Sequence, residues 1–325
     1  MHTSSDPFIT PPDITDLRAA QQRIAPYARV TPVLHSEWLD ALAGCTLHFK
    51  CENLQRAGAF KFRGACNAVF SLSDEQAARG VVTQSSGNHG AALALACRLR
   101  GVRATVVVPH GAPRIKLEAI RDNGAEVIGC ETRQADRDRV TAEVLARTQA
   151  SYVHPFNDAR VIAGQGTATL ELLHTVPSID TLIAPISGGG LMSGTAIAAH
   201  SINPAIQVIG AEPEGARDAF DSLASGERIV GRATQTICDG LRAELGPLTF
   251  PILQAHLQRI LLAEDAETIA AMRLLWERLK VVVEPSCALP LAVILKYPQH
   301  FVGREVGVIL SGGNVDLDSL PWLAA

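Results

Sequence analysis

Aromatic and charged residues are both scarce in this chain. Of its 325 residues, 5% are aromatic and 19% are charged, and 29 Lys and Arg against 33 Asp and Glu give a formal net charge of −4. Proteins that bind nucleic acids need clustered positive charge for the phosphates and often aromatic rings for the bases. Anionic membrane surfaces also attract basic runs. This sequence has no basic run, so we expect neither a nucleic acid nor a membrane as partner.

The seven cysteines match neither a disulfide framework nor a zinc site. Their number is odd, and no two of them have the C-x-x-C spacing. Disulfide-rich secreted proteins carry even numbers of cysteines, and structural zinc sites use closely spaced ones. Residues 1–10 also lack the basic and apolar segments of a signal peptide. We therefore expect reduced, buried thiols in a cytoplasmic protein.

Residues 181–211 contain no charged side chain and could be mistaken for a membrane span. Pro185 and the glycines at 188–190 interrupt the stretch, so a continuous apolar helix of about 20 residues is not available. The pattern instead predicts a buried strand, a glycine turn, a buried helix and a second strand.

Hydrophobic residues make up 47% of the chain, enough for a sizeable core. Short β-branched runs alternate with longer helical stretches, which is typical of a mostly parallel, doubly wound α/β sheet. The length suggests about two domains. We expect a small domain over residues 80–157 and a large one over residues 1–79 and 158–325. Strands are expected at 80–84, 103–109, 126–130, 181–184, 207–211 and 305–310, and helices at 88–100, 113–123, 136–149, 266–280 and 288–296.

Three glycine-bearing turns follow expected strands: SSGNHG at 85–90, SGGG at 187–190 and SGGN at 311–314. Ligands of open α/β sheets bind at the carboxyl ends of strands. Glycine lets the backbone approach a ligand closely, and the N-terminus of the next helix attracts anions. Two such turns could bind a carboxylate and a phosphate. The alternative is that each turn only caps a helix.

A second alternative is a nicotinamide-binding turn. Gly188-x-Gly190-x-x-Ser193 resembles a dinucleotide fingerprint, and Glu212 follows at a suitable distance for binding a ribose. However, serine replaces the third glycine, and Met192 adds bulk inside the motif. The fingerprint is therefore weak.

Lys61 lies between two aromatic residues, Phe60 and Phe62, at the expected start of a helix. Desolvation beside aromatic rings lowers the pKa of an amine and makes it a nucleophile that can form a Schiff base. The alternative is a surface lysine that extends its amine into solvent.

Taken together and in this order, GAFKFRGACNAV, SSGNHG, SGGGLMSG, EPS and SGGN resemble the fold type II pyridoxal phosphate enzymes. Within that class the chain is similar to the serine racemase and serine/threonine dehydratase group, over residues 14–317. The resemblance implies a tryptophan synthase β-like α/β fold. Such a fold has two doubly wound parallel-sheet domains with the cofactor in the cleft between them.

The resemblance also implies roles for individual residues around pyridoxal 5'-phosphate. Lys61 matches the Schiff-base lysine, which later acts as the base at the substrate Cα, and Phe60 lies beside the ring. Asn88 matches the partner of the ring 3'-oxygen, and Ser311 matches the partner of the pyridine nitrogen. A hydroxyl at that nitrogen makes the ring a weaker electron sink, which suits β-elimination better than transamination. The remaining matches are the phosphate loop and an acid near the cofactor: Ser187, Gly188, Gly189, Gly190, Leu191 and Glu284.

Ser85, Asn88 and His89 match the loop that holds the substrate α-carboxylate. Ser86 matches the residue opposite the lysine, which serves racemases as a second acid or base. Some dehydratases carry the same serine, so it does not decide between the two reactions. His89 could instead be a capping or core histidine.

Glu212, Asp218 and the carbonyl of Ala216 match a divalent-cation site of the racemase-like members. Oxygen ligands of this kind suit Mg²⁺, and Ca²⁺ or Mn²⁺ are the other candidates. Two ordinary surface acids are the alternative. Arg137 matches an arginine that can reach a second substrate carboxylate in some relatives, but its charged surroundings favour a solvated helix face.

The expected activity is therefore that of an ammonia-lyase (dehydratase) acting on L-threonine or L-serine. Serine racemase and threo-3-hydroxyaspartate ammonia-lyase activities are the alternatives within the group. A non-catalytic amino-acid sensor is the alternative outside it. The resemblance also implies a homodimer.

Overall fold

The computed structural model describes residues 10–112 and 114–323 and contains two sheets. The larger sheet has six strands in the order β1-β2-β10-β7-β8-β9. The β1 strand pairs antiparallel with β2, and the other neighbours are parallel. Its strands are β1 (Val33–Leu34), β2 (Thr46–Cys51), β7 (Thr181–Pro185), β8 (Gln207–Pro213), β9 (Arg259–Ala263) and β10 (Glu305–Leu310).

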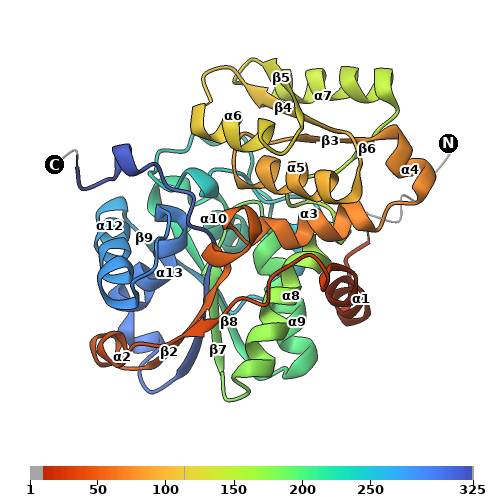
Figure 1. Cartoon of the computed structure of the whole chain (residues 1–325). Coiled ribbons are helices and arrows are strands. Elements are labelled where there is room, and N and C mark those ends of the chain that lie inside the picture. The colour runs from red at the N-terminus through yellow and green to blue at the C-terminus, as the bar shows by residue number, and fades with distance from the viewer. Residues whose placement is uncertain (1–9, 113, 324–325) are drawn as a thin grey trace.

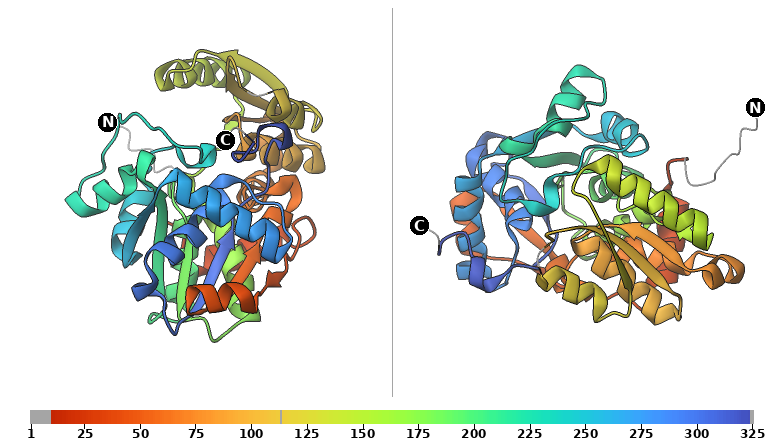
Figure 2. Two further views of the ribbon diagram at one scale, coloured as in Figure 1. Left: turned by 90° about the vertical axis from the view of Figure 1, so that its left-hand side faces the viewer. Right: turned by 90° about the horizontal axis from the view of Figure 1, so that it is seen from above.

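The smaller sheet has four parallel strands in the order β5-β4-β3-β6. In Figure 1 it occupies the upper part of the molecule, above the six-stranded sheet, and the left-hand view of Figure 2 shows the same arrangement from the side. Its strands are β3 (Val81–Gln84), β4 (Ala104–Pro109), β5 (Glu126–Cys130) and β6 (Ser151–Tyr152).

Helices cover both sheets and connect their strands. They are α1 (Ile14–Ile24), α2 (Glu37–Ala43), α3 (Lys61–Phe70), α4 (Asp74–Arg79), α5 (Asn88–Arg100), α6 (Arg114–Arg121), α7 (Gln134–Thr148), α8 (Ala159–Thr175), α9 (Gly190–Ile202), α10 (Asp218–Ser225), α11 (Thr249–His256), α12 (Asp265–Leu274) and α13 (Pro285–Lys296). Short helical turns include η1 (Glu52–Leu54), η2 (Arg56–Gly58), η3 (Glu214–Ala216) and η4 (Asp239–Leu241), and the π-helix Leu275–Leu279 continues α12.

Alternate residues of the strands enter different hydrophobic cores, as expected for sheets covered on both faces. In β4, Val106 packs with residues of α3 and α5, whereas Val107 packs with Val144 of α7. In β7, Leu182 packs with residues of α8 and α9, whereas Ile183 packs with residues of α2 and α13. The predicted α/β class with doubly wound parallel sheets is confirmed.

The sequence located some elements better than others. The strands expected at 126–130 and 305–310 are β5 and β10. The helix expected at 113–123 is α6, and Pro113 itself lies outside the described residues. The sequence pattern did not predict β2, which contains His48 and Lys50 among its apolar residues. Lys50 is nevertheless buried, because a distant carboxylate pairs with it.

Helix α3 links the two parts of the molecule, and Figure 1 shows it between the smaller sheet and the helices of the larger one. Its residues Phe62, Ala65 and Val69 belong to the same core as α5 and β4. The domain limits at residues 80 and 157 therefore stay a prediction, because the core beneath the smaller sheet begins before residue 80.

Within the described residues, no helix is long and apolar enough to cross a membrane.

Candidate active site

Lys61 is the first residue of α3, and its amine points at the loop after β6. The Nζ atom donates a hydrogen bond of 2.9 Å to the carbonyl of Pro155 and lies 5.2 Å from the centre of the Phe60 ring. Burial lowers the pKa of Lys61 to about 8. A lysine with a lowered pKa releases its proton more easily, so its amine can act as a nucleophile or as a base near neutral pH.

Two histidines close to Lys61 are held neutral. The backbone N–H groups of Phe156 and Asn157 donate to Nδ1 of His154, at 3.3 and 3.0 Å. Burial lowers the pKa of His154 to about 4. Burial, together with the charges of Lys61 and His154, lowers the pKa of His89 well below its usual value. Neither imidazole ring is therefore protonated at neutral pH, so neither adds a positive charge beside the Lys61 amine.

The SGGG turn connects β7 to α9 and leaves no room for side chains at its glycine positions. A Cβ atom at Gly188 would lie 2.3 Å from the Phe156 ring. Gly189 has a φ of +89°, in the left-handed region that favours glycine, and precedes the first residue of α9. The free N–H groups at the start of α9 form an anion-binding site of the kind that phosphates occupy.

Ser187 and Thr249 hold this turn in place. The hydroxyl of Thr249 donates to the carbonyl of Gly188 at 2.7 Å. The hydroxyl of Ser187 donates to the carbonyl of Ala243 at 3.1 Å and accepts from its N–H at 3.0 Å. Ser187 therefore fixes the turn against the loop before α11. Leu191 follows in the first turn of α9 and is buried.

The SSGNHG turn connects β3 to α5 and is more open. Ser85, Ser86 and Asn88 are partly exposed, whereas His89 is buried in the first turn of α5. The hydroxyl of Ser85 accepts the N–H of Gly87 at 3.3 Å. The start of α5 thus gives a second group of helix N–H donors on the side of the smaller sheet.

The SGGN turn after β10 lies against the loop that carries Lys61. The N–H of Phe60 donates to the carbonyl of Ser311 at 3.0 Å, and Ala59 forms a bridge with Gly312. Ser311 is buried at the end of β10. The structure thus brings the segments that carry Lys61 and Ser311 together, although 249 residues lie between these two positions in the sequence.

The family comparison agrees with this arrangement. A family model described as "Pyridoxal-phosphate dependent enzyme" matches residues 24–312. The chain belongs to this family.

Relatives of known structure or curated function cover nearly all of the chain. It is 49% identical over 311 residues to the beta-hydroxyaspartate dehydratase of Paracoccus denitrificans, covering 96% of this chain and 99% of that protein. It is 50% identical to the serine racemase of Arabidopsis thaliana, covering 95% of each. The structure of maize serine racemase superposes with a TM-score of 0.93 at 48% identity, covering 96% of each chain.

The residues present fit the cofactor of this pyridoxal-phosphate dependent family. Lys61 offers an amine with a lowered pKa, and the SGGG turn offers backbone N–H groups where a Cβ at Gly188 or Gly189 would collide with Phe156 or Thr249. The buried Ser311 adds a hydroxyl beside the lysine loop. The roles of these residues toward the cofactor stay predictions.

Asn88 and Glu284 form a contact that the sequence did not predict. The Nδ2 of Asn88 donates to Glu284 at 2.9 Å, and its Oδ1 accepts from Asn314 at 2.9 Å. Burial and the charge of Asp239 raise the pKa of Glu284 to about 8. Glu284 is therefore mostly protonated at neutral pH. The predicted bond from Asn88 to the ring 3'-oxygen has to share the amide with this contact.

Glu212 and Asp218 lie close together at the end of β8 and the start of α10. Glu212 accepts the N–H groups of Ala219 and Phe220 at 2.8 and 2.7 Å. The Oδ2 of Asp218 is buried and has no hydrogen-bond partner within the described residues. Burial and Asp218 raise the pKa of Glu212 well above its usual value, and burial raises that of Asp218 to about 6.

Glu212 and Asp218 are not the two surface carboxylates that were the alternative to a cation site. Both side chains are buried, and a pocket of about 140 Å³ lies beside Asp218 and Ala216. Among residues 10–112 and 114–323, however, no group of three or more His, Cys, Asp or Glu side chains could hold a metal ion. A cation here would need the carbonyl of Ala216 and water as further ligands.

Arg137 makes its contact locally. Its guanidinium donates to the carbonyl of Thr132 at 3.1 Å, just before its own helix, α7. No sequence motif indicated His154 and Phe156, which lie in the loop after β6. The signal that could have found them is their position at the carboxyl end of a strand of the smaller sheet.

Proposed function

We propose that this chain is a pyridoxal 5'-phosphate-dependent ammonia-lyase that converts small L-3-hydroxy amino acids to 2-oxo acids and ammonia. The observation that carries the proposal is Lys61, an amine of lowered pKa that has two neutral histidines nearby and follows a segment bonded to the end of β10. L-Threonine and L-serine are substrates in the proposal. L-threo-3-hydroxyaspartate joins them because a relative with 49% identity is named beta-hydroxyaspartate dehydratase.

The helix N-termini supply the binding steps. The start of α9, with the SGGG turn, binds the phosphate of the cofactor, and the start of α5 binds the α-carboxylate of the substrate. When bound, the cofactor supplies an aldehyde that reacts with amines and a ring that withdraws electrons from the bond to the α-hydrogen. Ser311 donates a hydrogen bond toward that ring without giving it a full charge.

Lys61 moves the proton. Its amine, with a pKa of about 8, removes the α-hydrogen of the substrate, after which the 3-hydroxyl leaves as water. Because burial and Lys61 keep His89 neutral, that ring can accept or donate a hydrogen bond without repelling the protonated lysine. Hydrolysis then yields the 2-oxo acid and ammonia.

Racemisation of serine is a second candidate, supported by Ser86 and by the 50% identity to a serine racemase. Ser86 lies in the partly exposed SSGNHG turn, where its hydroxyl could return a proton to the other face of the substrate. The proposal also includes a Mg²⁺ ion, or Ca²⁺ or Mn²⁺, bound by Glu212, Asp218 and the carbonyl of Ala216. It further includes a homodimer. It also includes a cytoplasmic location, which is supported by the seven buried cysteines that form no disulfide.

The test is the release of ammonia and 2-oxo acid by the purified protein with pyridoxal phosphate and Mg²⁺. The substrates are L-threonine, L-serine and L-threo-3-hydroxyaspartate, and the enantiomer of the remaining serine is determined. We expect release from at least one of them. If D-serine forms with little ammonia, racemisation replaces ammonia release as the proposed activity. If the protein is coloured but inactive on all three substrates, the proposed substrate class is wrong.

Lys61→Ala should abolish turnover and the absorbance of cofactor bound through the lysine, because no other amine replaces the one on α3. Lys296→Ala is the matched control, since that lysine pairs with Glu267 away from the site. It should leave both readouts unchanged. Turnover by Lys61→Ala at the rate of the control would contradict the assignment.

A further inference from the structure

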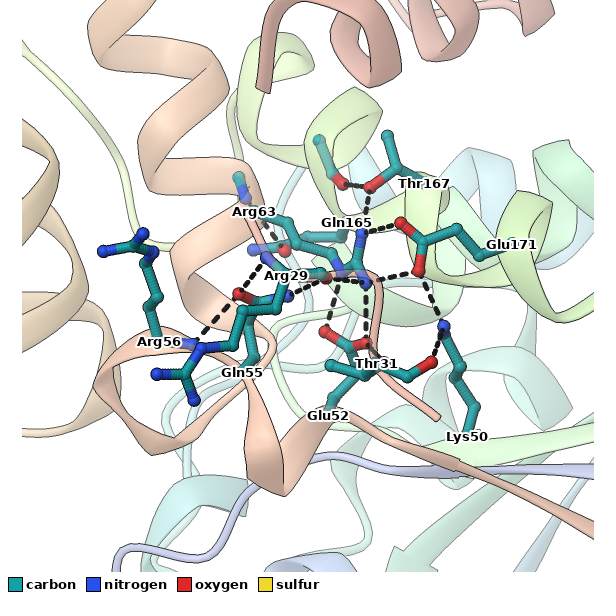
Figure 3. Close-up of polar contacts among 12 residues, drawn as sticks. Arg29, Thr31, Lys50, Glu52, Gln55, Arg56, Arg63, Gln165, Thr167 and Glu171 are labelled. Atoms are coloured by element: carbon teal, nitrogen blue, oxygen red, sulfur yellow. Dashed lines mark hydrogen bonds and ion pairs between the residues drawn. The ribbon is translucent and has the colours of Figure 1, made fainter. Parts of the chain in front are cut away.

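Arg63 is completely buried two residues after Lys61. Its side chain is 0% exposed, as is that of its partner Glu52. The guanidinium donates to Glu52 from Nε and Nη2, at 2.7 and 2.8 Å, and to Glu171 from Nη1 and Nη2, at 2.7 and 2.8 Å. Two carboxylates thus grip the planar fork from two sides, as Figure 3 shows. Such paired bonds fix orientation as well as position.

Lys50 completes a charge-balanced network around Arg63. Its Nζ donates to Glu171 at 2.6 Å and to the carbonyl of Thr31 at 2.7 Å. The hydroxyl of Thr31 donates to Glu52 at 2.5 Å (Figure 3). Two cations and two carboxylates therefore neutralise one another. We call Arg63, Lys50, Glu52 and Glu171 the Arg63 network.

The network joins four secondary-structure elements: β2 and η1, which follow each other in the sequence, and α3 and α8. Lys50 lies on β2 and Glu52 on η1, Arg63 lies on α3, and Glu171 lies on α8. The carbonyl of Arg29, in the segment before β1, accepts a further bond from Arg63 at 3.2 Å. Only tertiary structure brings Glu171 to Lys50 and Arg63, which lie 121 and 108 positions away, so the network fixes α3 relative to both β2 and α8.

Arg63 and Lys61 lie on opposite sides of the first turn of α3. Residues of an α-helix are separated by about 100°, so two positions correspond to about 200°. Lys61 faces the carbonyl of Pro155, whereas Arg63 faces Glu52 and Glu171. Any rotation or shift of this turn that relaxes the network would also move the lysine amine.

The packing of α3 against α8 leaves little freedom for such a shift. A Cβ atom at Gly164 of α8 would lie 2.6 Å from the carbonyl oxygen of Arg63. The side chain of Gln165 accepts the N–H of Gly64 at 3.1 Å, in the first turn of α3. Phe60, which precedes the helix, has an apolar side chain that cannot cap it. Neighbouring elements, rather than a local cap, therefore hold the helix start.

A buried ion network is a weak source of stability, because desolvation of the charges offsets much of their attraction. A fully satisfied network does define one geometry. We propose that Arg63, gripped by Glu52 and Glu171, is a positioning residue that sets the place of the Lys61 amine. The inference rests on the proposed function in one respect, namely that Lys61 is the amine that reacts with the cofactor.

The test compares the wild type with Arg63→Lys, which keeps the charge and loses the fork. We expect kcat to fall on the order of 10²-fold with little change in KM, because a small misplacement of the reacting group acts on the chemical step. Addition of pyridoxal phosphate to the cofactor-free protein should produce the absorbance of the lysine-bound cofactor more slowly. The pH at which that absorbance changes should also shift.

Two further variants keep the outcome decisive. Glu171→Gln preserves the shape of the network and should show the same changes to a smaller degree. It replaces Arg63→Lys in the test if that variant does not fold. Leu39→Ala opens a cavity in the core of the larger sheet, on α2, and is the control for lost stability alone. It should lower the melting temperature and leave the absorbance kinetics and their pH dependence unchanged.

The absorbance readout separates this inference from the choice of substrate. If the wild type binds cofactor through Lys61 but turns over none of the substrates, the substrate class fails and the absorbance kinetics still decide the role of Arg63. If the folded Arg63→Lys and Glu171→Gln proteins behave as Leu39→Ala does, the positioning role is overturned. If the wild type shows no lysine-bound cofactor, the proposed function and this inference fail together.

Discussion

Two buried acidic sites of this protein balance their charges in opposite ways. In the Arg63 network, burial alone would raise the pKa of Glu52, but the charge and hydrogen bonds of Arg63 lower it overall. At the second site, burial and the neighbouring Asp218 raise the pKa of Glu212. The first site contains its own cations, whereas the second leaves a buried carboxylate oxygen of Asp218 without a partner in the described chain. The comparison separates a finished structural site from one that is suited to a cation from solution.

The largest effect is expected from a substitution that unbalances the charges of the Arg63 network. Glu52→Gln removes one of its two negative charges and leaves Arg63 and Lys50 with only Glu171. Because an uncompensated charge remains buried, we expect the free energy of unfolding to fall by about 3–5 kcal/mol. Equilibrium denaturation of the cofactor-free protein measures the loss.

The matched control is Glu75→Gln on α4. Glu75 pairs with Arg79 on the surface of the helix, where water screens the charges. The same substitution should change the free energy of unfolding there by no more than about 0.5 kcal/mol. Equal effects at both positions would show that the buried network is not held by its charge balance.

The acidic pair should respond to Mg²⁺ where the Arg63 network does not. With Mg²⁺ at 100 times its dissociation constant, binding to the folded protein alone would stabilise it by about 2.7 kcal/mol. Asp218→Asn should abolish that gain, as thermal denaturation with and without Mg²⁺ would show. Glu214→Gln is the control, because Glu214 lines the same pocket but is exposed and pairs with Arg217.

Without Mg²⁺ the sign of the pH dependence is fixed by the raised pKa of Asp218, about 6 in the folded protein against 3.8. Between these values the folded state keeps a proton that the unfolded state has lost, so stability falls as the pH rises through this window. Asp218→Asn removes that cost. The cofactor-free variant should therefore be at least as stable as the wild type at pH 8, and a less stable variant would argue against an unbalanced site.

The same contrast explains what the sequence could predict of the fold. The apolar runs of β5 and β10 are visible locally, because covered parallel strands are rich in Val and Ile. Strand β2 is not visible, because it contains Lys50, whose burial depends on Glu171, 121 residues away. A charged residue predicts exposure until its partner is known, and that partner is supplied by tertiary structure.

The candidate site shows the same limit. The ordered motifs predicted Lys61, the glycine turns and Ser311, and the structure brings Lys61 and Ser311 onto adjacent backbone segments. His154 carries no motif, so only the folded chain shows its effect on the pKa of His89. The contact between Asn88 and Glu284 was equally invisible, since it joins residues 196 positions apart.

Glu284 is intermediate between the acids of these two sites. It is buried like Glu52 and accepts a hydrogen bond from Asn88, but it has no cation bound directly to it among its described contacts. Burial and Asp239 raise its pKa from 4.5 to about 8, whereas Lys116 acts in the opposite direction. The folded protein therefore retains a proton here in a pH range where the unfolded chain has lost it.

The resulting prediction is a falling stability as the pH rises from about 4.5 to about 8, with Glu284 contributing about 1.4 kcal/mol per pH unit. Glu284→Gln keeps the shape and cannot ionise, so its stability between pH 6 and 7 should change less steeply by about that amount. Denaturation of the cofactor-free proteins at the two pH values measures the difference. Parallel profiles would mean that Glu284 ionises freely in the folded state, and it would then resemble a solvated acid rather than either buried site.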